Sequence, residues 1–456
     1  MSEKTFRVGY HRIAVEPTEP IPLTGYSNEA ARFHKEVAQE ICATCVAISD
    51  KEDNTVLMIG LDICTIVGEI YTSVRQRVAQ ATGIDDTHIY IAATHTHAAP
   101  GVGHADKWPE MRRYADRLYD AIIQAAVKAL EDRKPAGMMT GSIETENMNF
   151  VKHYRAMDKK TNEITYIGDC FGTEAGKVLV DHATKADPTI HVVKFTREGG
   201  KDIVMANFRA HPHFDGGSKV YKLSSDYIGA FRTALESLVD CHAVYFQGAS
   251  GNQNARSRLP NERIFNCAIS YGLALAGYVA ECLDKYMRVV PTGAVKTKQV
   301  RFVGHINHTM DHLAEVGKSL RTRWNQDFTW ANYKDEAAQY GIRSQFHAGA
   351  VWWNSERTDE EDGWMILNAV AIGEEFAFVT FPGEMFDSIS VRMEENSPYF
   401  TTMMLGYCYH HLGYLPSAVA YKYTSYETDI TRFAPGTGEM VADKHVEMLR
   451  ELKNQQ

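Results

Sequence analysis

Short apolar runs typical of strands alternate with longer amphipathic, helical segments along most of this 456-residue chain. Early examples are an apolar run over residues 55–62, a helical pattern over 69–81 that Gly83 ends, and a second apolar run over 88–94. Strands mixed with helices of this length predict an α/β fold with mixed, largely buried sheets and flanking helices.

The same alternation continues toward the C-terminus. We expect a helix over residues 108–132, followed in the chain by further strands and helices. The strands are 190–195, 203–208, 243–247, 300–303, 364–371, 376–381 and 401–408, and the helices are 226–238, 263–286 and one after Pro382. There is no internal repeat, low-complexity segment or Pro/Gly/Ser-rich linker, so we expect residues 1–456 to form a single large domain.

Composition excludes several classes of protein. The chain is 44% apolar and 23% charged, which is usual for globular proteins and not for disordered, collagen-like or coiled-coil ones. A net charge of −10 argues against nucleic acid or an anionic membrane as the main partner. Asp62 interrupts the best apolar stretch, residues 56–68, so we expect no membrane-spanning helix.

The chain shows no mark of export. Its first residues, MSEKTFRVGYHR, lack the apolar region of a signal peptide, and eight cysteines are too few for a disulfide scaffold. Cys42 and Cys45 form a CxxC, but they sit in the strand-like ICATCVAI without a second CxxC to complete a zinc site, so we interpret them as buried structural thiols. These features together predict a cytoplasmic protein.

The segment THTHAAPG (94–101) places His95 and His97 where a predicted strand breaks into a loop. Residues two apart on a strand face the same way, so both imidazoles could point into one site, and ligand crevices form at strand ends in α/β sheets. This HxH pair indicates a metal site. The alternative is two histidines that form hydrogen bonds in a surface turn.

Two further segments offer ligands at strand ends. His211 and His213 follow the predicted strand 203–208, and His213 is either a ligand or a surface residue. Glu384, in FPGE, follows an apolar strand and a Pro-Gly turn at a predicted helix start, where a capping role is the alternative. Two histidines and one glutamate form the ligand set that catalytic zinc uses, with a coordination position left for water.

Two more segments could contribute to such a site. Residues 406–427 hold six tyrosines together with His410 and His411. Dense tyrosines usually pack, but near a metal a phenolate can coordinate and a phenol can hydrogen-bond an oxyanion. The second segment, FQGASGNQN (246–254), ends a strand in small polar residues, so it is either a tight turn or a backbone wall of the pocket.

An ordered set of motifs resembles the neutral/alkaline ceramidase family, in its N-terminal catalytic domain. The motifs are THTHAAPG (94–101), NFRAHP (207–212), SSDYIGAFRTALE (224–236), FQGASGNQN (246–254), FPGE (381–384) and GYLP…YE (413–427). The resemblance implies a zinc-dependent amidase that cleaves an N-acyl bond by attack of zinc-bound water. Its implied ligands of a single zinc ion are His95, His211, Glu384 and Tyr414.

The resemblance also implies catalytic roles. His97 would be the general base that then protonates the leaving amine, and Tyr426 would stabilise the oxyanion. A family arginine that contacts substrate matches Arg155 or Lys152, of which we prefer Arg155. His411 stands where relatives often have tyrosine, so it competes with Tyr414 as fourth ligand.

Two departures from the family pattern bear on activity. Relatives carry a serine in the segment that matches GNQN, where the nearest residue here is Asn254, and this disfavours a serine mechanism. Ceramidases are exported or membrane-facing and carry a C-terminal immunoglobulin-like domain, which we do not expect here. We therefore expect a soluble small-molecule amide as substrate rather than ceramide.

The alternatives to this function are a related zinc hydrolase or lyase acting on an ester, lactam or sugar derivative, and a non-catalytic zinc-binding protein. We expect no nucleic-acid partner and no stable membrane insertion, and a homo-oligomer is compatible with the sequence.

Overall fold

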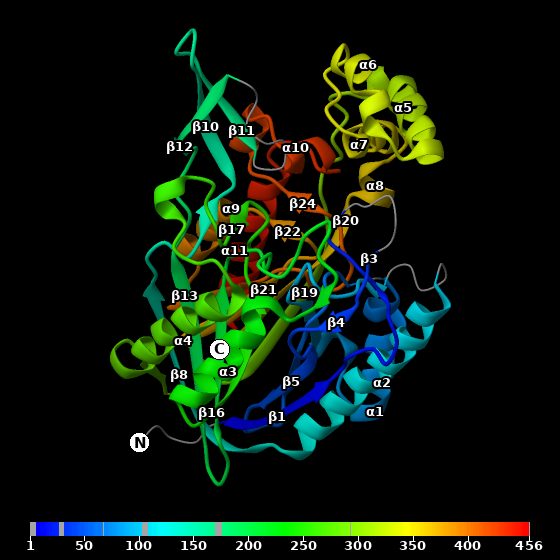
Figure 1. Cartoon of the computed structure of the whole chain (residues 1–456). Helices are drawn as coiled ribbons and strands as arrows, with labels where there is room; N and C mark the ends of the chain where they lie inside the picture. Colours follow the sequence, from blue (N-terminus) through cyan, green and yellow to red (C-terminus); the bar gives the residue numbers. More distant parts are fainter. Residues whose placement is uncertain are drawn as a thin grey trace.

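The computed structural model describes residues 6–26, 32–66, 68–102, 108–168, 176–291 and 293–455. Two β-sheets packed face to face form the centre of the fold, and helices cover their outer faces (Figure 1). The predicted α/β fold with mixed sheets and flanking helices is therefore confirmed.

The larger sheet has the strand order β16-β14-β13-β8-β1-β5-β6-β7, and β18 pairs with β8. Its strands are β1 (Phe6–Ala14), β5 (Cys42–Ser49), β6 (Thr55–Leu61), β7 (Ile89–Ala93), β8 (Lys134–Glu144), β13 (Thr189–Arg197), β14 (Asp202–Phe208), β16 (Cys241–Gln247) and β18 (Arg288–Val290). The smaller sheet has the order β19-β20-β21-β23. Its strands are β19 (Val295–Val303), β20 (Trp364–Ile372), β21 (Phe376–Thr380) and β23 (Thr401–Leu405).

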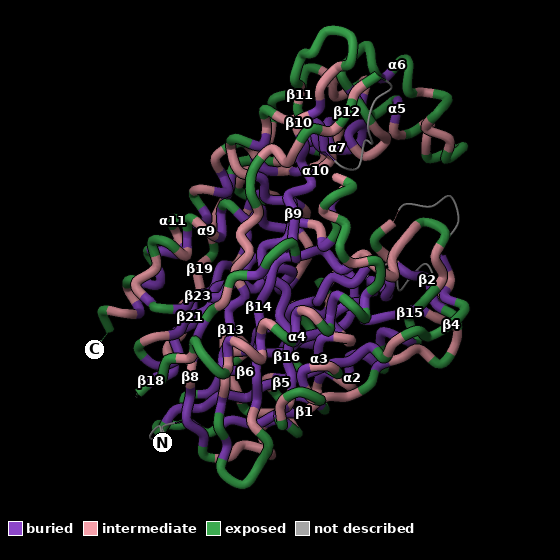
Figure 2. Tube along the Cα trace, turned by 60° about the vertical axis from the view of Figure 1, so that its left-hand side comes forward, coloured by how far each residue is buried: buried purple, intermediate pink, exposed green. Residues whose placement is uncertain are grey.

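Helices cover the outer faces of both sheets. The larger sheet is covered by α1 (Arg75–Thr82), α2 (Pro109–Glu131), α3 (Asp226–Leu238) and α4 (Ala268–Lys285). The smaller sheet is covered by α9 (Asp387–Asn396) and α11 (Thr437–Asn454). Figure 2 shows the buried residues concentrated along the strands between these layers.

Burial on both faces explains the uninterrupted apolar runs of the central strands. In β6, Leu57 and Ile59 pack toward α1 and α2, whereas Met58 packs toward the smaller sheet. Tyr90 of β7 meets Phe378 of β21 edge-to-face, with ring centroids 5.1 Å apart. A strand buried on both sides needs apolar residues at every position, which is why these segments show no polar alternation.

Parallel pairs bring several strand ends to one edge of the molecule. β6 runs parallel to β7, β14 to β16, and β21 to β23. Backbone hydrogen bonds join the two sheets at their carboxyl ends, from Ala93 N to Tyr407 O (3.1 Å) and from Gly406 N to Gln247 O (3.0 Å). Loops that follow strands of both sheets therefore meet at one place.

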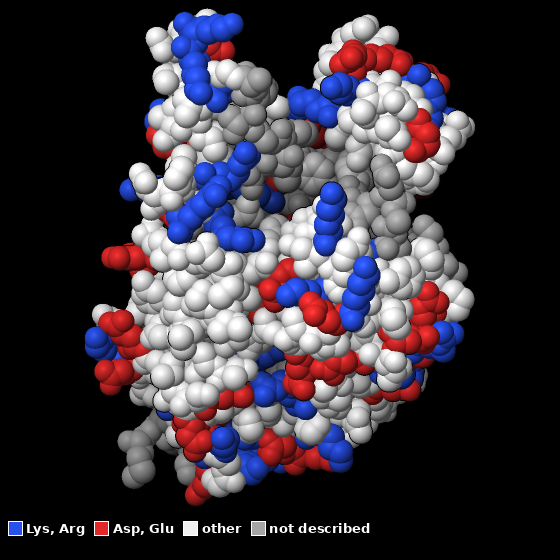
Figure 3. All heavy atoms as spheres, viewed as in Figure 1, with Lys and Arg blue, Asp and Glu red and all other residues white. Residues whose placement is uncertain are grey.

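Two insertions stand beyond this edge. One is a small sheet of β10 (His153–Asp158), β11 (Ile164–Gly168) and β12 (Lys177–His182). The other is a helical group of α5 (Ala314–Asp327), α6 (Lys334–Ala338), α7 (Gln345–Ser355) and α8 (Asp359–Asp362), at the upper right of Figure 1. The surface is hollowed between them (Figure 3).

Most predicted elements match the structure, with shifted ends. The helix over 226–238 is α3 with the same bounds. The predicted helix over 263–286 was wrong at its start, because α4 begins only at Ala268. The helix over 69–81 begins as a π-helical turn, Ile70–Val74, before α1. Cys42 and Cys45 are buried free thiols in β5, as predicted.

Within the described ranges, no helix has the length and apolar character needed to cross a membrane. Asp62, which interrupts the longest apolar stretch, lies directly after β6 and is 1% exposed. It forms a bidentate ion pair with Arg232 of α3, at 3.0 and 2.6 Å, and accepts a hydrogen bond from Cys42 N. The pair fixes α3 against the sheet.

The Arg232→Met variant is expected to lower the free energy of unfolding by about 3–5 kcal/mol, because it leaves the buried Asp62 carboxylate without a counter-charge. Urea denaturation measures the loss. The matched control is Arg392→Met, which breaks an exposed pair with Asp443 and should cost less than about 1 kcal/mol. Equal losses in the two variants would show that the buried pair does not have this structural role.

Candidate metal centre

Loops at the shared sheet edge bring four histidines and one glutamate together. His95 and His97 follow β7, His211 and His213 follow β14, and Glu384 follows β21. Three overlapping groups have ligand atoms within 4.8 Å of one another. They are Cys64, His95 and His97; His97, His211 and His213; and His95, His211 and Glu384. We call these six residues the histidine cluster.

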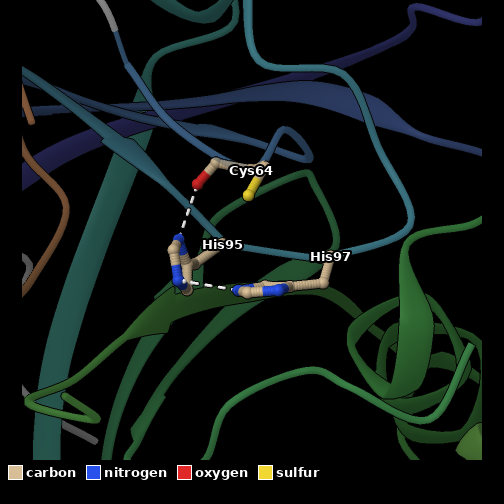
Figure 4. Close-up of side chains that lie close together, drawn as sticks. All are labelled: Cys64, His95 and His97. Carbon is tan, nitrogen blue, oxygen red and sulfur yellow. Dashed lines mark hydrogen bonds between the residues drawn. The ribbon is translucent and has the colours of Figure 1, made fainter. Parts of the chain in front are cut away.

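His95 is held by contacts on both sides of its ring. Its Nδ1–H donates to the backbone oxygen of Cys64 at 2.7 Å, so Nε2 is left as the ligand atom (Figure 4). Nε2 lies 3.0 Å from Nε2 of His97 and 3.5 Å from Oε2 of Glu384. Tyr407 stacks on the ring with centroids 4.1 Å apart, and its hydroxyl contacts Ser250 Oγ at 2.7 Å.

His211 repeats the arrangement of His95. Its Nδ1–H donates to the backbone oxygen of Gln253 at 3.0 Å, and its Nε2 lies 3.1 Å from Oε2 of Glu384. A backbone oxygen can only accept, so this bond fixes the tautomer and directs Nε2 toward the carboxylate. The segment 246–254 thus shows both predicted features: a tight turn closed from Gln253 N to Ser250 O at 2.9 Å, and a backbone oxygen that holds His211.

Glu384 does not cap a helix. It lies in the short strand β22 (Glu384–Met385), which pairs with β24 (Tyr414–Leu415), and α9 begins only at Asp387. The helix start predicted at Glu384 was therefore wrong. A side chain on Gly251 would place Cβ 2.4 Å from the Glu384 backbone oxygen, so this close approach requires glycine.

Neighbouring charges in the histidine cluster shift one another's pKa values. Burial raises the pKa of Glu384, but His95 and His211 outweigh burial and hold that pKa well below its usual range. Burial lowers the pKa of His95, but the Glu384 carboxylate and Cys64 outweigh it and raise the pKa to about 10. Burial and the charge of Lys152 lower the pKa of His211 to about 4 despite its bond to Glu384.

The His97 ring lies between the ring of His95 and that of His213. Its ring centroid lies 4.6 Å from that of His95 and 4.2 Å from that of His213. Burial and the neighbouring His95 and His211 hold its pKa well below the usual value. Gly25, at φ +99°, packs on the ring, and a Cβ there would lie 2.4 Å from His97 Nδ1.

The donor set fits zinc. In a tetrahedral site with zinc–nitrogen and zinc–oxygen bonds of about 2.0–2.1 Å, neighbouring ligand atoms lie about 3.3 Å apart. The Glu384 Oε2 separations of 3.1 Å to His211 and 3.5 Å to His95 match this spacing. Both histidines also have the backbone hydrogen bond on Nδ1 that zinc-binding imidazoles usually show.

Both candidates for the fourth ligand adjoin Glu384. Tyr414 is the backbone partner of Glu384 in the β22–β24 pair, and its ring lies 6.0 Å from that of Tyr426, which opens α10 (Tyr426–Ile430). His411 lies 3.4 Å from Oε1 of Glu384, measured from its Nε2. These contacts bring both residues to the cluster and leave the choice between them a prediction.

Lys152 and Arg155, the two candidates for substrate contact, lie in different surroundings. Lys152 is buried, pairs with Glu427 at 2.9 Å, and has its Nζ 5.3 Å from the Tyr414 ring centroid. Arg155, on β10, is 42% exposed and forms an ion pair with Asp181 of β12. These contacts bring Lys152 beside the cluster and give our preference for Arg155 no support, so the role of Arg155 stays a prediction.

Of the comparisons with known proteins, the one with solved structures bears on the fold. No protein-family model matches the chain, and no curated protein matches it. Among solved structures, the chain is similar to neutral ceramidase from Pseudomonas aeruginosa, with a TM-score of 0.69 and 16% identity over 99% of this chain and 75% of that one. It is also similar to a ceramidase complexed with C2, with a TM-score of 0.72 and 15% identity over 98% and 75%. The chain thus has a ceramidase-like fold.

Several contacts of the cluster escaped sequence reasoning. Cys64, whose backbone oxygen holds His95, and Tyr407, whose ring stacks on His95, each lie just after a strand. Neither residue belongs to a recognisable sequence motif. Tyr26 lies edge-on to His97 with ring centroids 5.3 Å apart, although about 70 residues separate them. The one available signal was for Tyr407, whose position in the tyrosine-rich run marked the segment but not the residue.

Proposed function

We propose that this protein is a zinc-dependent hydrolase that cleaves the N-acyl bond of a small amide. The observation that carries the proposal is the buried set of His95, His211 and Glu384, whose ligand atoms are spaced as around tetrahedral zinc. The ceramidase-like fold supports an amide as substrate, since the similar structures are named as ceramidases.

Zinc at these ligands would supply a water of lowered pKa and polarise the substrate carbonyl. We assign the proton transfer to His97, and the 3.0 Å distance between its Nε2 and Nε2 of His95 supports this role. The imidazole takes a proton from the attacking water and delivers it to the nitrogen of the leaving amine. Gly25 and Tyr26 hold the ring in position from the other side.

The tyrosine pair completes the proposed site. Tyr414 would provide the fourth donor, with His411 as the other candidate, and the Tyr426 hydroxyl would hydrogen-bond the oxygen that becomes negative during attack. The buried ammonium group of Lys152 adds positive charge on the same side of the cluster. A metal site together with a hydroxyl donor and a nearby ammonium group favours acyl transfer to water.

The metal and the activity can be tested on the purified protein. We expect about one zinc per chain by elemental analysis, because the three donor groups overlap and share ligands. Chelation should abolish hydrolysis of short N-acyl amides, and added zinc should restore it. A protein that binds no metal after gentle purification and gains no activity with zinc would contradict the proposal.

A substrate panel defines the class. We propose that soluble, short or polar N-acyl compounds are cleaved with higher kcat/KM than long-chain ceramide, and that the protein acts in the cytoplasm. Esters and lactams belong in the same panel, because a carbonyl activated by zinc is attacked in each of them. A maximum of kcat/KM at long-chain ceramide would contradict the proposed substrate class.

A further inference from the structure

A cavity of about 390 Å³ adjoins the histidine cluster and has a markedly basic lining. Among the described residues that line it are Arg256, Arg258 and Arg263, and none is aspartate or glutamate. The three arginines come from the segment between β17 (Gln253–Asn254) and α4. Figure 3 shows Lys and Arg side chains gathered on this face of the molecule, beside the position of β17 in Figure 1.

Two of these arginines have no carboxylate partner among the described residues. Arg256 donates to the backbone oxygen of His213 at 3.1 Å. Arg263 donates to the backbone oxygens of Ser257 and Arg258, at 3.1 and 3.4 Å. Backbone carbonyls hold a guanidinium in place without cancelling its charge. Both arginines are exposed at the cavity, and in a protein of net charge −10 two cations held by backbone oxygens favour binding of a negatively charged group there.

The cavity wall also fixes the orientation of Arg256. Its guanidinium carbon lies 4.7 Å from the ring centroid of Phe214, which is the geometry of a cation–π contact. A guanidinium stacked on one face keeps its in-plane N–H groups available for a carboxylate or phosphate. Less side-chain freedom is then lost when an anion binds.

The cavity is connected to the histidine cluster through His213, which lines it. The His213 ring lies 4.2 Å from His97 and 4.7 Å from His211 by centroids. Tyr26, another lining residue, contacts both His97 and His213. Two residues that line the cavity, Tyr26 and His213, are therefore in ring contact with His97, the proposed general base.

We propose that this cavity binds an anionic group of the substrate, so that the preferred substrates are N-acyl compounds carrying a carboxylate or a phosphate. The proposal rests on the hydrolase function proposed above. Water adds to the carbonyl carbon, the C–N bond breaks, and the products are a carboxylic acid and an amine that has gained the proton. The arginines do not take part in bond making, and they position the substrate through its charge.

The test compares matched pairs of amides that differ in one anionic group. N-acetyl-β-alanine is compared with its neutral primary amide, and N-acetyl-O-phosphoethanolamine with N-acetylethanolamine. We expect the wild-type protein to prefer one or both anionic members in kcat/KM. Arg256→Gln and Arg263→Gln should each lower kcat/KM about 10- to 100-fold for the anionic member, as expected for loss of a charged hydrogen bond, and little for the neutral one.

Arg450→Gln is the control, because Arg450 is an exposed arginine on α11 outside this cavity. It should leave both members of each pair unchanged. The carboxylate and phosphate pairs separate the two kinds of anion. Hydrolysis without preference for either anion, or an equal loss on charged and neutral members in the Arg256 and Arg263 variants, would overturn the proposal.

A binding measurement separates this proposal from the proposed function. Titration calorimetry with inorganic phosphate and with acetate uses the wild-type protein, the Arg256→Gln/Arg263→Gln double variant and the Arg450→Gln control. If no amide is cleaved but the double variant alone loses anion binding, the anion site in the cavity stands, whereas the hydrolase function fails together with the substrate role given to that site. If no anion binds to the wild-type protein, or the double variant binds as well as it does, the cavity proposal fails.

Discussion

The His95→Ala variant is expected to lose zinc and, with it, hydrolytic activity. His95 offers Nε2 to the cluster and is oriented by its bond to the Cys64 backbone oxygen, so no other atom of the variant can occupy its position. Changes in residues that merely orient a ligand lower metal affinity about 10- to 100-fold, and loss of the ligand itself should exceed this. Zinc content after dialysis and competition with a chelator measure the effect.

The matched control for His95→Ala is His445→Ala. His445 is another buried histidine, on α11; its Nε2 contacts the Thr380 backbone oxygen, and it belongs to none of the three ligand groups found among the described residues. Its removal should cost stability by leaving a cavity and an unpaired carbonyl, while zinc content stays at the wild-type level. A His95→Ala protein with full zinc content would remove His95 from the ligand set.

The His97→Ala variant is expected to keep zinc while kcat falls by a factor of about 10² to 10⁴, the usual contribution of a positioned acid/base group. His97 lies within 3.0 Å of His95 but is not a member of the His95–His211–Glu384 set. Added imidazole should recover part of the activity, because the vacated space can hold a free ring. Zinc analysis and steady-state kinetics on the same preparation separate the two effects.

The two histidines could also exchange roles. His97 forms its own metal-binding group with His211 and His213. If His97→Ala loses zinc while His95→Ala retains it, the ion is bound by that group instead. If both variants keep zinc and full activity, the site is elsewhere.

The fold was largely predictable because its central strands are buried on both faces. Continuous apolar runs such as β6 and β7, with the amphipathic α1 between them and α2 after them, leave few alternatives to a layered α/β structure. The residues at which helices and strands begin and end were less predictable. Residues 263–267 continue the helical pattern of α4 in sequence but form the loop beside the arginine-lined cavity.

The four histidines and Glu384 were predictable as candidate ligands from their positions after strands, but their geometry was not. The two imidazoles of HTH were expected to face the same way because they lay on a strand. In the structure β7 ends at Ala93, and His95 has φ +63°, so a left-handed residue turns the rings toward each other. Local pattern does not reveal such a conformation in a non-glycine residue, nor does it reveal which of Lys152 and Arg155 lies beside the cluster.

The origin of the proposed ligands in two different sheets has a consequence for the unfolded chain. His95 and His211 belong to loops of the larger sheet, and Glu384 to a loop of the smaller one. His211 and Glu384 are 173 residues apart in the chain, so an ion that binds both closes a very long loop. Closing such a loop in an unfolded chain has an entropic cost, whereas in the folded chain the two ligand atoms already lie 3.1 Å apart. The bound metal would therefore act as a reversible crosslink between the two halves of the molecule.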